Sequence, residues 1–250
     1  MTPIDGQFRF EHTDQLAVIT VDRPAKANSY TAQMLDQLDG HLERIEQDES
    51  VRVLIVTGEG RRHFCAGADL TYVEGRTVMD SYELPTARIF NRLADLPIPT
   101  IAAINGAAVG GGLELALACD YRLAAEDVAT MALPEITKGL IPAAGGARRL
   151  PAIIGLGRAT EMVLGGKSVF AATALDWGLV TATHPSTVLL DAARHLGHSL
   201  AKRDRIALRF AKQALRRFEN QFGTDFEDRL AQSLLTSRKD DLAVDKSTSK

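Results

Sequence analysis

Three consecutive glycines stand directly before an apolar run that carries a single carboxylate. Gly110, Gly111 and Gly112 precede Leu113, and Glu114 lies among leucines and alanines. Glycine lets the backbone approach a ligand closely, and a helix that begins here leaves its first N–H groups without intrahelical partners. Such a helix end suits an anion or a developing oxyanion. On the glycines alone, a tight strand-to-helix turn without a ligand is an equal alternative.

Two carboxylates lie in apolar surroundings near this point. Glu114 lies within one helical turn of the glycines, where burial of a carboxylate is costly unless it is paired or used in chemistry. Glu135 follows a proline in a second apolar stretch, "MALPEITKGL". Each has a structural alternative, a salt bridge for Glu114 and a helix start for Glu135. Together, the two could supply the acid and the base for a proton transfer beside an oxyanion.

A second turn of small residues, "HFCAGADL", follows a stretch that reads as a buried strand. It is either an ordinary turn or the source of another backbone donor, which would complete a two-donor oxyanion hole. The glycine spacing fits neither GxGxxG nor a phosphate loop. Six scattered histidines and two cysteines, interpreted as buried free thiols, lack metal-ligand spacing, so no metal site is predicted.

The elements that must position these residues read as an α/β arrangement. Residues 8–13 and 16–22 are predicted strands, and 51–58 is a continuous apolar strand. Between them, residues 32–47 place apolar side chains at helical intervals, with Ser29 or Thr31 as the N-cap. Because parallel strands need a crossover, strand–helix–strand order favours a parallel sheet.

The same order recurs further along the chain. A loop at 58–70 is followed by a predicted helix at 85–96 and by strands at 99–106 and 121–125. Beyond Pro142 the pattern is almost entirely helical, and the polar residues 240–250 are expected to be disordered. The predicted helices of this second half span residues 145–155, 157–166, 171–178, 187–203 and 204–222.

Bulk composition excludes several classes of protein. The chain has 250 residues, 45% of them hydrophobic, with a net charge of -3, which is ordinary for one large domain. There is no dense block of Lys or Arg, so no nucleic-acid partner is predicted. No segment reaches the ~20 apolar residues of a membrane span, and the first residues do not read as a signal peptide. We expect a cytoplasmic protein without membrane association.

Several motifs, in order along nearly the whole chain, resemble the enoyl-CoA hydratase/isomerase superfamily, which has the crotonase fold. They are "VDRPAKANSYT", "FCAGADL", "AINGAAVGGGLELALACDYRLAAEDV", "LPEITKGLIPAAGGARRLPAIIG" and "ALDWGLV". The resemblance implies a core of ββα units wound into a spiral over residues 1–190. It also implies a helical trimerisation region at 191–239, before the tail at 240–250, and a homotrimer or homohexamer.

The resemblance also assigns site residues. Ala68 and Gly111 match the positions whose backbone N–H groups form the oxyanion hole for a thioester carbonyl. Glu114 and Glu135 match the two catalytic glutamates of the hydratases. Positions that match the family's CoA- and substrate-binding segments are Lys26, Ala27, Asn28, Ala66, Gly67, Asp69, Leu70 and Gly110.

The implied activity is reversible addition of water to a 2-enoyl-CoA thioester, with no cofactor or metal and with an acyl-CoA as the small-molecule partner. Glu114 would deprotonate the water and Glu135 would protonate the α carbon. The alternatives are isomerisation using Glu135 alone, decarboxylation, hydrolysis, the same chemistry on a carrier-protein-bound acyl group, or a catalytically silent CoA-binding oligomer.

Some segments depart from the family pattern or have structural interpretations. Residues 237–250 do not match the usual final helix of the family, and 71–87 fall where the family varies its acyl pocket. Core or surface packing is the preferred interpretation there for Tyr72, Val73, Met79 and Tyr82. We interpret Asp69 as a possible helix cap, Trp177 as core, and Arg148 and Arg149 as partners of acidic neighbours or cover for a helix surface.

Overall fold

The structure is a computed structural model of the chain, and it describes residues 6–75, 77–219, 233 and 236. An antiparallel hairpin of β1 (Gln7–Thr13) and β2 (Leu16–Asp22) comes first, followed by the short 3₁₀ helix η1 (Pro24–Lys26) and by α1 (Ala32–Gln47). Thr31 is the N-cap of α1, since its Oγ1 accepts from Met34 N–H at 3.3 Å. β3 (Val53–Gly58) then pairs in parallel with β2.

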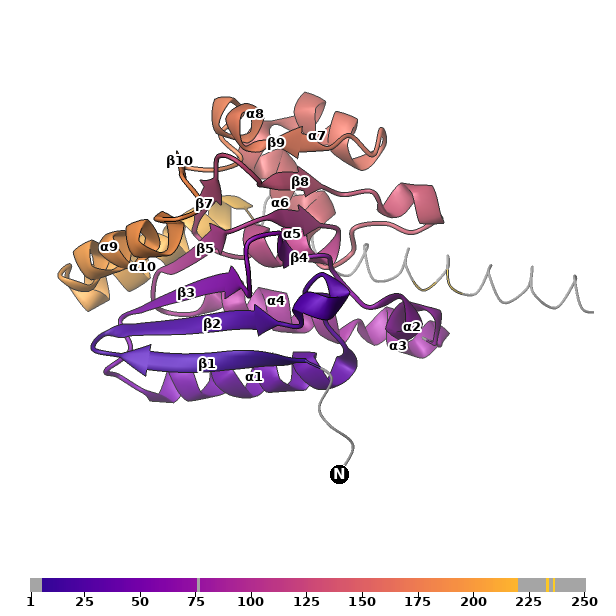
Figure 1. Cartoon of the computed structure of the whole chain (residues 1–250). Helices are drawn as coiled ribbons and strands as arrows, with labels where there is room; N and C mark the ends of the chain where they lie inside the picture. Colours follow the sequence, from indigo (N-terminus) through magenta and orange to yellow (C-terminus); the bar gives the residue numbers. More distant parts are fainter. Residues whose placement is uncertain (1–5, 76, 220–232, 234–235, 237–250) are drawn as a thin grey trace, which may run out of the picture.

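Two sheets form the centre of the molecule (Figure 1). In the described residues, the larger sheet has the strand order β1-β2-β3-β5-β7-β10, and the smaller one has the order β4-β6-β8-β9. The strands not yet bounded are β4 (His63–Cys65), β5 (Thr100–Ile104), β6 (Ala107–Val109), β7 (Tyr121–Ala125), β8 (Thr130–Ala132), β9 (Val169–Phe170) and β10 (Ala182–His184).

The chain alternates between the two sheets. β3, β5 and β7 of the larger sheet are each followed by a strand of the smaller one, β4, β6 and β8, and then by helical structure. All pairs among β3, β5, β7 and among β4, β6, β8 are parallel. This repetition is the predicted spiral of ββα units, and it places the ends of successive short strands side by side.

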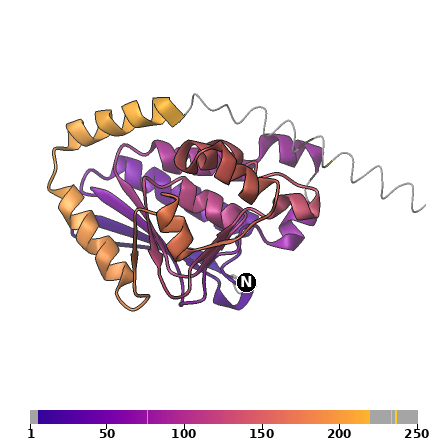
Figure 2. The same cartoon turned by 90° about the horizontal axis from the view of Figure 1, so that it is seen from above.

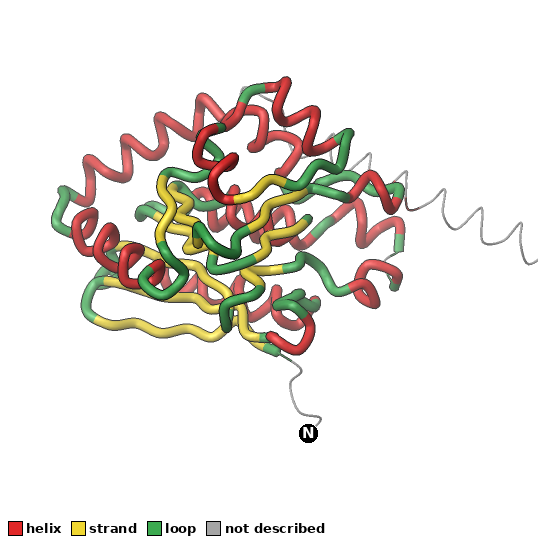
Figure 3. The backbone as a smooth tube through the Cα atoms, turned by 45° about the horizontal axis from the view of Figure 1, so that its top comes forward, coloured by secondary structure: helices red, strands yellow, loops and turns green. Residues whose placement is uncertain are grey.

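Helices cover much of this double sheet, and the hairpin of β1 and β2 lies at its edge (Figure 3). The strands β3 and β5 are buried at every residue, as their unbroken apolar sequences predict. The helices and the second 3₁₀ segment up to residue 176 are α2 (Leu70–Glu74), α3 (Val78–Glu83), α4 (Pro85–Asp95), α5 (Gly111–Leu117), η2 (Glu135–Lys138), α6 (Gly146–Ile154), α7 (Leu156–Val163) and α8 (Ala171–Asp176).

The last two described helices fall within or next to the predicted C-terminal region. α9 (Leu189–Ala201) packs across the larger sheet, and Gly197 lets it approach β2, since a Cβ there would lie 3.0 Å from Leu16 Cδ2. α10 (Arg205–Glu219) turns back along another side of the molecule (Figure 2). Most of the chain after residue 219, including the predicted tail at 240–250, lies outside the described residues.

A buried ion pair fixes α10 to the core. Lys212 Nζ lies 2.7 Å from Asp120 Oδ2 and donates to the carbonyl oxygen of Ile98 at 2.9 Å. Asp120 also accepts from the N–H and the hydroxyl of Thr100. These contacts give Asp120 a structural role. No helix in the described part of the chain has both the length and the apolarity that a membrane crossing requires.

Two secondary-structure predictions need correction. The predicted loop at 58–70 contains β4 and the start of α2, and the predicted helical half also contains the short strands β9 and β10. Strands of two or three residues carry too little alternation to be recognised in a sequence. The interpretation of Arg148 and Arg149 as surface cover is also wrong, because both are buried within α6.

Candidate active site

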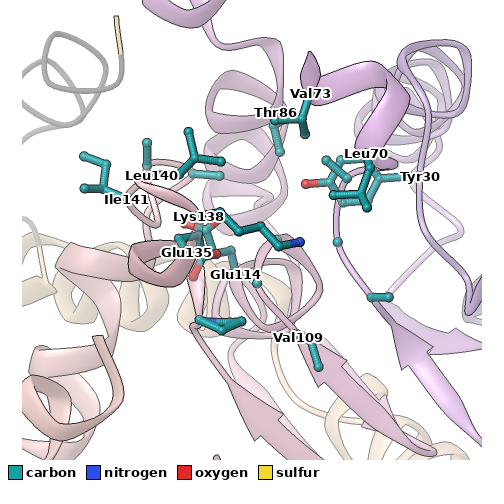
Figure 4. Close-up of a pocket in the computed structure, with 18 of the residues that line it drawn as sticks. Tyr30, Leu70, Val73, Thr86, Val109, Glu114, Glu135, Lys138, Leu140 and Ile141 are labelled. Carbon is teal, nitrogen blue, oxygen red and sulfur yellow. The ribbon is translucent and has the colours of Figure 1, made fainter. Parts of the chain in front are cut away.

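A pocket of about 400 Å³ opens where the smaller sheet meets α5, η2 and the segment from α2 to α4 (Figure 4). It is mostly apolar and contains two carboxyl groups. Its lining consists of Tyr30, Ala66, Gly67, Ala68, Leu70, Val73, Leu84, Thr86, Val109, Gly110, Gly111, Glu114, Pro134, Glu135, Lys138, Leu140, Ile141, Ala143 and Ala144.

The turn after β4 is held by a single parallel bridge. Tyr30 N–H donates to Gly67 O, and Asp69 N–H donates to Tyr30 O, both at 2.9 Å. In a parallel bridge the residue between the two bonded neighbours turns its own N–H and C=O to the opposite side. The amide of Ala68 therefore faces away from Tyr30, and Ala68 lines the pocket.

The turn after β6 lies directly against the turn after β4. A Cβ on Gly67 would lie 3.0 Å from Gly111 N, and Gly67 has φ +89°, so glycine permits both the approach and the conformation. Gly111 is the first residue of α5, whose first N–H groups have no intrahelical acceptors. A Cβ on Gly111 would overlap the Tyr30 hydroxyl. The backbone amides of Ala68 and Gly111 are thus brought together at one pocket.

Glu114 projects from the first turn of α5 and is buried. Its Oε1 accepts from Gly146 N–H at 2.8 Å, at the start of α6. Burial, together with the charge of Glu135, raises the pKa of Glu114 to about 8, against the opposing effects of the Gly146 and Ala144 N–H groups and of Arg149. Glu114 therefore gives up its proton at a higher pH than an ordinary carboxyl group does.

Glu135 begins η2, immediately after Pro134. Its Oε2 is buried, and no other described residue provides a hydrogen-bond partner for it. Burial raises the pKa of Glu135 to about 7, opposed in part by the positive charge of Lys138. Because the two carboxyl groups disfavour each other's ionisation, the pair holds one shared proton over a pH range near neutrality.

The sequence-predicted residues divide into two groups. Eight of them line the pocket, namely Ala66, Gly67, Ala68, Leu70, Gly110, Gly111, Glu114 and Glu135. The other four, Lys26, Ala27, Asn28 and Asp69, are not part of the lining.

The structure shows the environment of each of the four residues outside the lining. Asn28 is fully buried, and its side-chain amide donates to the carbonyl oxygens of Glu59 and His63. Asp69 caps α2 through the N–H of Thr71 and forms an ion pair with Arg23 at 2.7 Å, in agreement with the interpretation as a helix cap. Lys26 is exposed on η1, and Ala27 follows it with φ 52°.

Sequence reasoning missed several groups of the site. Tyr30, Thr86 and Lys138 line the pocket, and Gly146 holds Glu114. The glycine pair before α6 was visible in the sequence, because it repeats the arrangement of glycines before α5. Nothing in the sequence distinguishes Thr86 or Lys138 from ordinary surface residues.

Arg149 acts on Glu114, and part of the segment 71–87 lines the pocket. Arg149 donates to Asn91 Oδ1 and to the Ala144 carbonyl oxygen, and its charge lowers the pKa of Glu114. Val73 lines the pocket, which corrects its interpretation as packing alone, whereas Met79 is exposed. Among the described residues, no group of three or more His, Cys, Asp or Glu side chains is placed to hold a metal ion.

Comparison with known proteins defines the class to which this fold and pocket belong. Residues 11–242 match the model of the family described as enoyl-CoA hydratase/isomerase. The chain belongs to the enoyl-CoA hydratase/isomerase family.

Individual relatives agree with this assignment. The chain is 40% identical over 202 residues to the 2,3-dehydroadipyl-CoA hydratase of Escherichia coli (strain K12), covering 81% of this chain and 78% of that protein. It is 37% identical over 240 residues to the enoyl-CoA isomerase/hydratase fer4 of Mycosarcoma maydis, covering 91% and 87%. The crystal structure of an enoyl-CoA hydratase from Bacillus anthracis superposes with a TM-score of 0.81 at 35% identity, covering 94% and 90%. Each of the three alignments covers at least 78% of both proteins.

Proposed function

We propose that this chain is an enoyl-CoA hydratase, which adds water reversibly to a 2-enoyl-CoA thioester and gives a 3-hydroxyacyl-CoA. The observation that carries the proposal is the pair of carboxyl groups, Glu114 and Glu135, in one pocket with the amides of Ala68 and Gly111. Isomerisation needs one base, whereas hydration needs a base for water and an acid for carbon. The second carboxyl group therefore favours hydration.

The two amides act on the thioester. Addition of water at the β carbon moves negative charge onto the thioester oxygen, where two N–H donors stabilise it. One of these donors belongs to the positive end of α5. Loss of one oxyanion-hole donor typically costs about 3 kcal/mol of barrier.

The glutamates divide the proton transfers. Glu114, held by Gly146 N–H, orients and deprotonates the water. Glu135, whose buried Oε2 has no other hydrogen-bond partner in the described residues, delivers a proton to the α carbon. A pair that holds one proton near neutral pH provides the base and the acid at the same time.

The test follows the ultraviolet band of the conjugated enoyl thioester of crotonyl-CoA, with the product mass measured in parallel. We expect the band to disappear and a hydrated product to form. The variants Glu114→Gln and Glu135→Gln keep the side-chain size, and each is expected to lower kcat by about 10²- to 10⁴-fold. Glu161→Gln, on the exposed surface of α7, is the matched control. Full activity in either pocket variant would contradict the assigned roles.

Isomerisation is the second candidate, because the buried Oε2 of Glu135 has no hydrogen-bond partner among the described residues and one relative is named an isomerase/hydratase. Transfer of a double bond from the 3 to the 2 position would then depend on Glu135 and not on Glu114. Deuterium exchange at the α carbon without water addition would support this candidate over hydration.

CoA binding and assembly complete the proposal. The exposed Lys26 and the adjacent Ala27 lie along the CoA portion of the substrate, and no cofactor or metal takes part. The buried Asn28 and the ion pair of Asp69 with Arg23 hold this segment in place. The large exposed apolar side chains of α10, Ile206, Phe210 and Leu215, support self-association, because exposed apolar groups mark interaction surfaces. The homotrimer or homohexamer is the assembly that the family resemblance implies.

A further inference from the structure

Lys138 is the charged pocket residue that the proposed mechanism does not use. It is the last residue of η2, three positions after Glu135, and it lines the pocket. Figure 4 shows its side chain extending away from η2, with the nitrogen directed toward the side where Tyr30 and Leu70 lie. Its ammonium group forms no hydrogen bond or ion pair with any other residue in the described ranges. The cation is therefore available to a bound molecule.

A second polar group of the pocket is also unused. Thr86 lies in the first turn of α4 and is 2% exposed. Its Oγ1 is buried and has no hydrogen-bond partner among the described residues, although the residue lines the pocket. A buried hydroxyl without a partner carries a free-energy cost, which a ligand that bonds to it would remove.

Apart from Tyr30, Glu114 and Glu135, the other residues of the lining are apolar. Leu84, Leu140 and Ile141 contribute to the same lining, and a saturated acyl chain needs only such surfaces. A methyl-ended chain would displace water from Lys138 and Thr86 without replacing its hydrogen bonds. A carboxylate would accept charge-assisted hydrogen bonds from the ammonium group and a further one from the hydroxyl.

We propose that Lys138 and Thr86 bind an anionic group at the far end of the acyl chain, so that the preferred substrates are 2-enoyl-CoA thioesters of dicarboxylic acids. This inference rests on the proposed function, since it assumes that the thioester lies against Ala68 and Gly111. Sites built to bond a polar substrate group discriminate strongly against analogues that lack it, because the site's own groups are then left unpaired.

One competing role for Lys138 predicts a different result. Its charge favours ionisation of Glu135, so it could act only by setting the protonation of the catalytic pair. That role would affect every substrate equally, whatever the end of its acyl chain. Recognition of a distal carboxylate affects only substrates that carry one.

The experiment compares matched substrates. It measures kcat/KM for six- and eight-carbon 2-enoyl-CoA thioesters that end in a carboxylate or in a methyl group. In the unaltered protein we expect a higher value for the acidic member of at least one pair. Lys138→Met should lower the ratio of acidic to neutral kcat/KM at least tenfold. The separate variant Thr86→Val should lower the same ratio. Lys202→Met removes the same charge from an exposed site at the end of α9 and should leave the ratio unchanged.

Other outcomes overturn the inference. An equal fall for both members of each pair in Lys138→Met would assign the residue to the catalytic pair or to CoA itself. Hydration of methyl-ended substrates with no preference for acidic ones would leave the proposed function intact and reject the recognition of a carboxylate.

A binding measurement separates the two proposals further. Calorimetry with the saturated six- and eight-carbon CoA thioesters, acidic and neutral, requires no turnover. If the protein hydrates neither substrate, tighter binding of an acidic thioester that depends on Lys138 still supports the inference. Equal affinities for the acidic and neutral thioesters at both lengths would overturn it.

Discussion

Glu114 and Glu135 make the protein's stability depend on pH, because each has a raised pKa in the folded state. In the unfolded chain both would ionise near pH 4.5, so between that value and about 7 to 8 the folded state binds more protons. The free energy of unfolding contributed by the pair is therefore fully present below pH 4.5 and is lost as the pH rises through the folded-state pKa values.

The direction in which the free energy of unfolding changes with pH can be measured directly. We expect the free energy of unfolding, from urea titrations between pH 5 and pH 9, to decrease more with rising pH in the unaltered protein than in the double variant Glu114→Gln/Glu135→Gln. Parallel pH curves for the two proteins would contradict the raised pKa values.

Gly67 provides a test of the two adjacent turns at the site. In Gly67→Ala the added Cβ would lie 3.0 Å from Gly111 N, and the residue would keep a positive φ. We expect kcat to fall by at least tenfold, because the amides of Ala68 and Gly111 must move apart. Gly60→Ala is the matched control, since Gly60 has φ +80° and open space around the Cβ position. An equal loss of kcat in both variants would assign the effect to backbone strain instead.

The sequence revealed those site residues whose chemistry conflicts with their surroundings. Glu114 and Glu135 are charges in apolar runs, and the glycines before α5 have an unusual spacing. Thr86 and Lys138 were missed because a threonine at a helix start and a lysine beside a glycine are common in exposed segments. Their place in the pocket depends on how α4 and η2 pack, which no local pattern encodes.

At the level of elements, long periodic segments were predictable and short ones were not. The prediction for residues 32–47 matches α1, and the strands at 16–22 and 51–58 correspond to β2 and β3. The strands of the smaller sheet have two or three residues each and owe their conformation to their neighbours. The site lies at the ends of these short strands. The residues of the site were therefore easier to predict from the sequence than the strands that hold them.

Lys212 and Arg216 of α10 both form ion pairs with Asp120, and the shorter one is that of Lys212. Lys212→Met removes the ammonium group that contacts Asp120 and the Ile98 carbonyl oxygen, and it leaves Asp120 without this cation in a largely buried place. We expect the free energy of unfolding to fall by about 2–3 kcal/mol in urea titrations. Lys202→Met, at an exposed position, should change it by less than about 0.5 kcal/mol. A result for Lys212→Met within the range of the control would show that Arg216 and packing hold α10 without Lys212.

At the level of the whole molecule, the exposed apolar side chains of α10 predict self-association. Phe210 is 63% exposed, and a carboxylate in its place would be costly to bury between subunits. We expect Phe210→Glu to reduce the molar mass measured by light scattering from that of a trimer or hexamer toward that of one chain. Gln47→Glu adds the same charge at the exposed end of α1 and should not change it. A multiple of the chain mass that survives Phe210→Glu would place the subunit contact elsewhere.

Winding the chain through two sheets distributes the site over residues 30–146. Tyr30 precedes the first complete ββα unit, Ala68 follows the strand pair of that unit, Glu114 belongs to the second unit, and Gly146 follows the third. A refolding chain that has formed only its early units therefore has helices and strands but no competent catalyst. During refolding, enzyme activity will return later than the circular dichroism signal. The time at which activity returns will report when the last of these units folds.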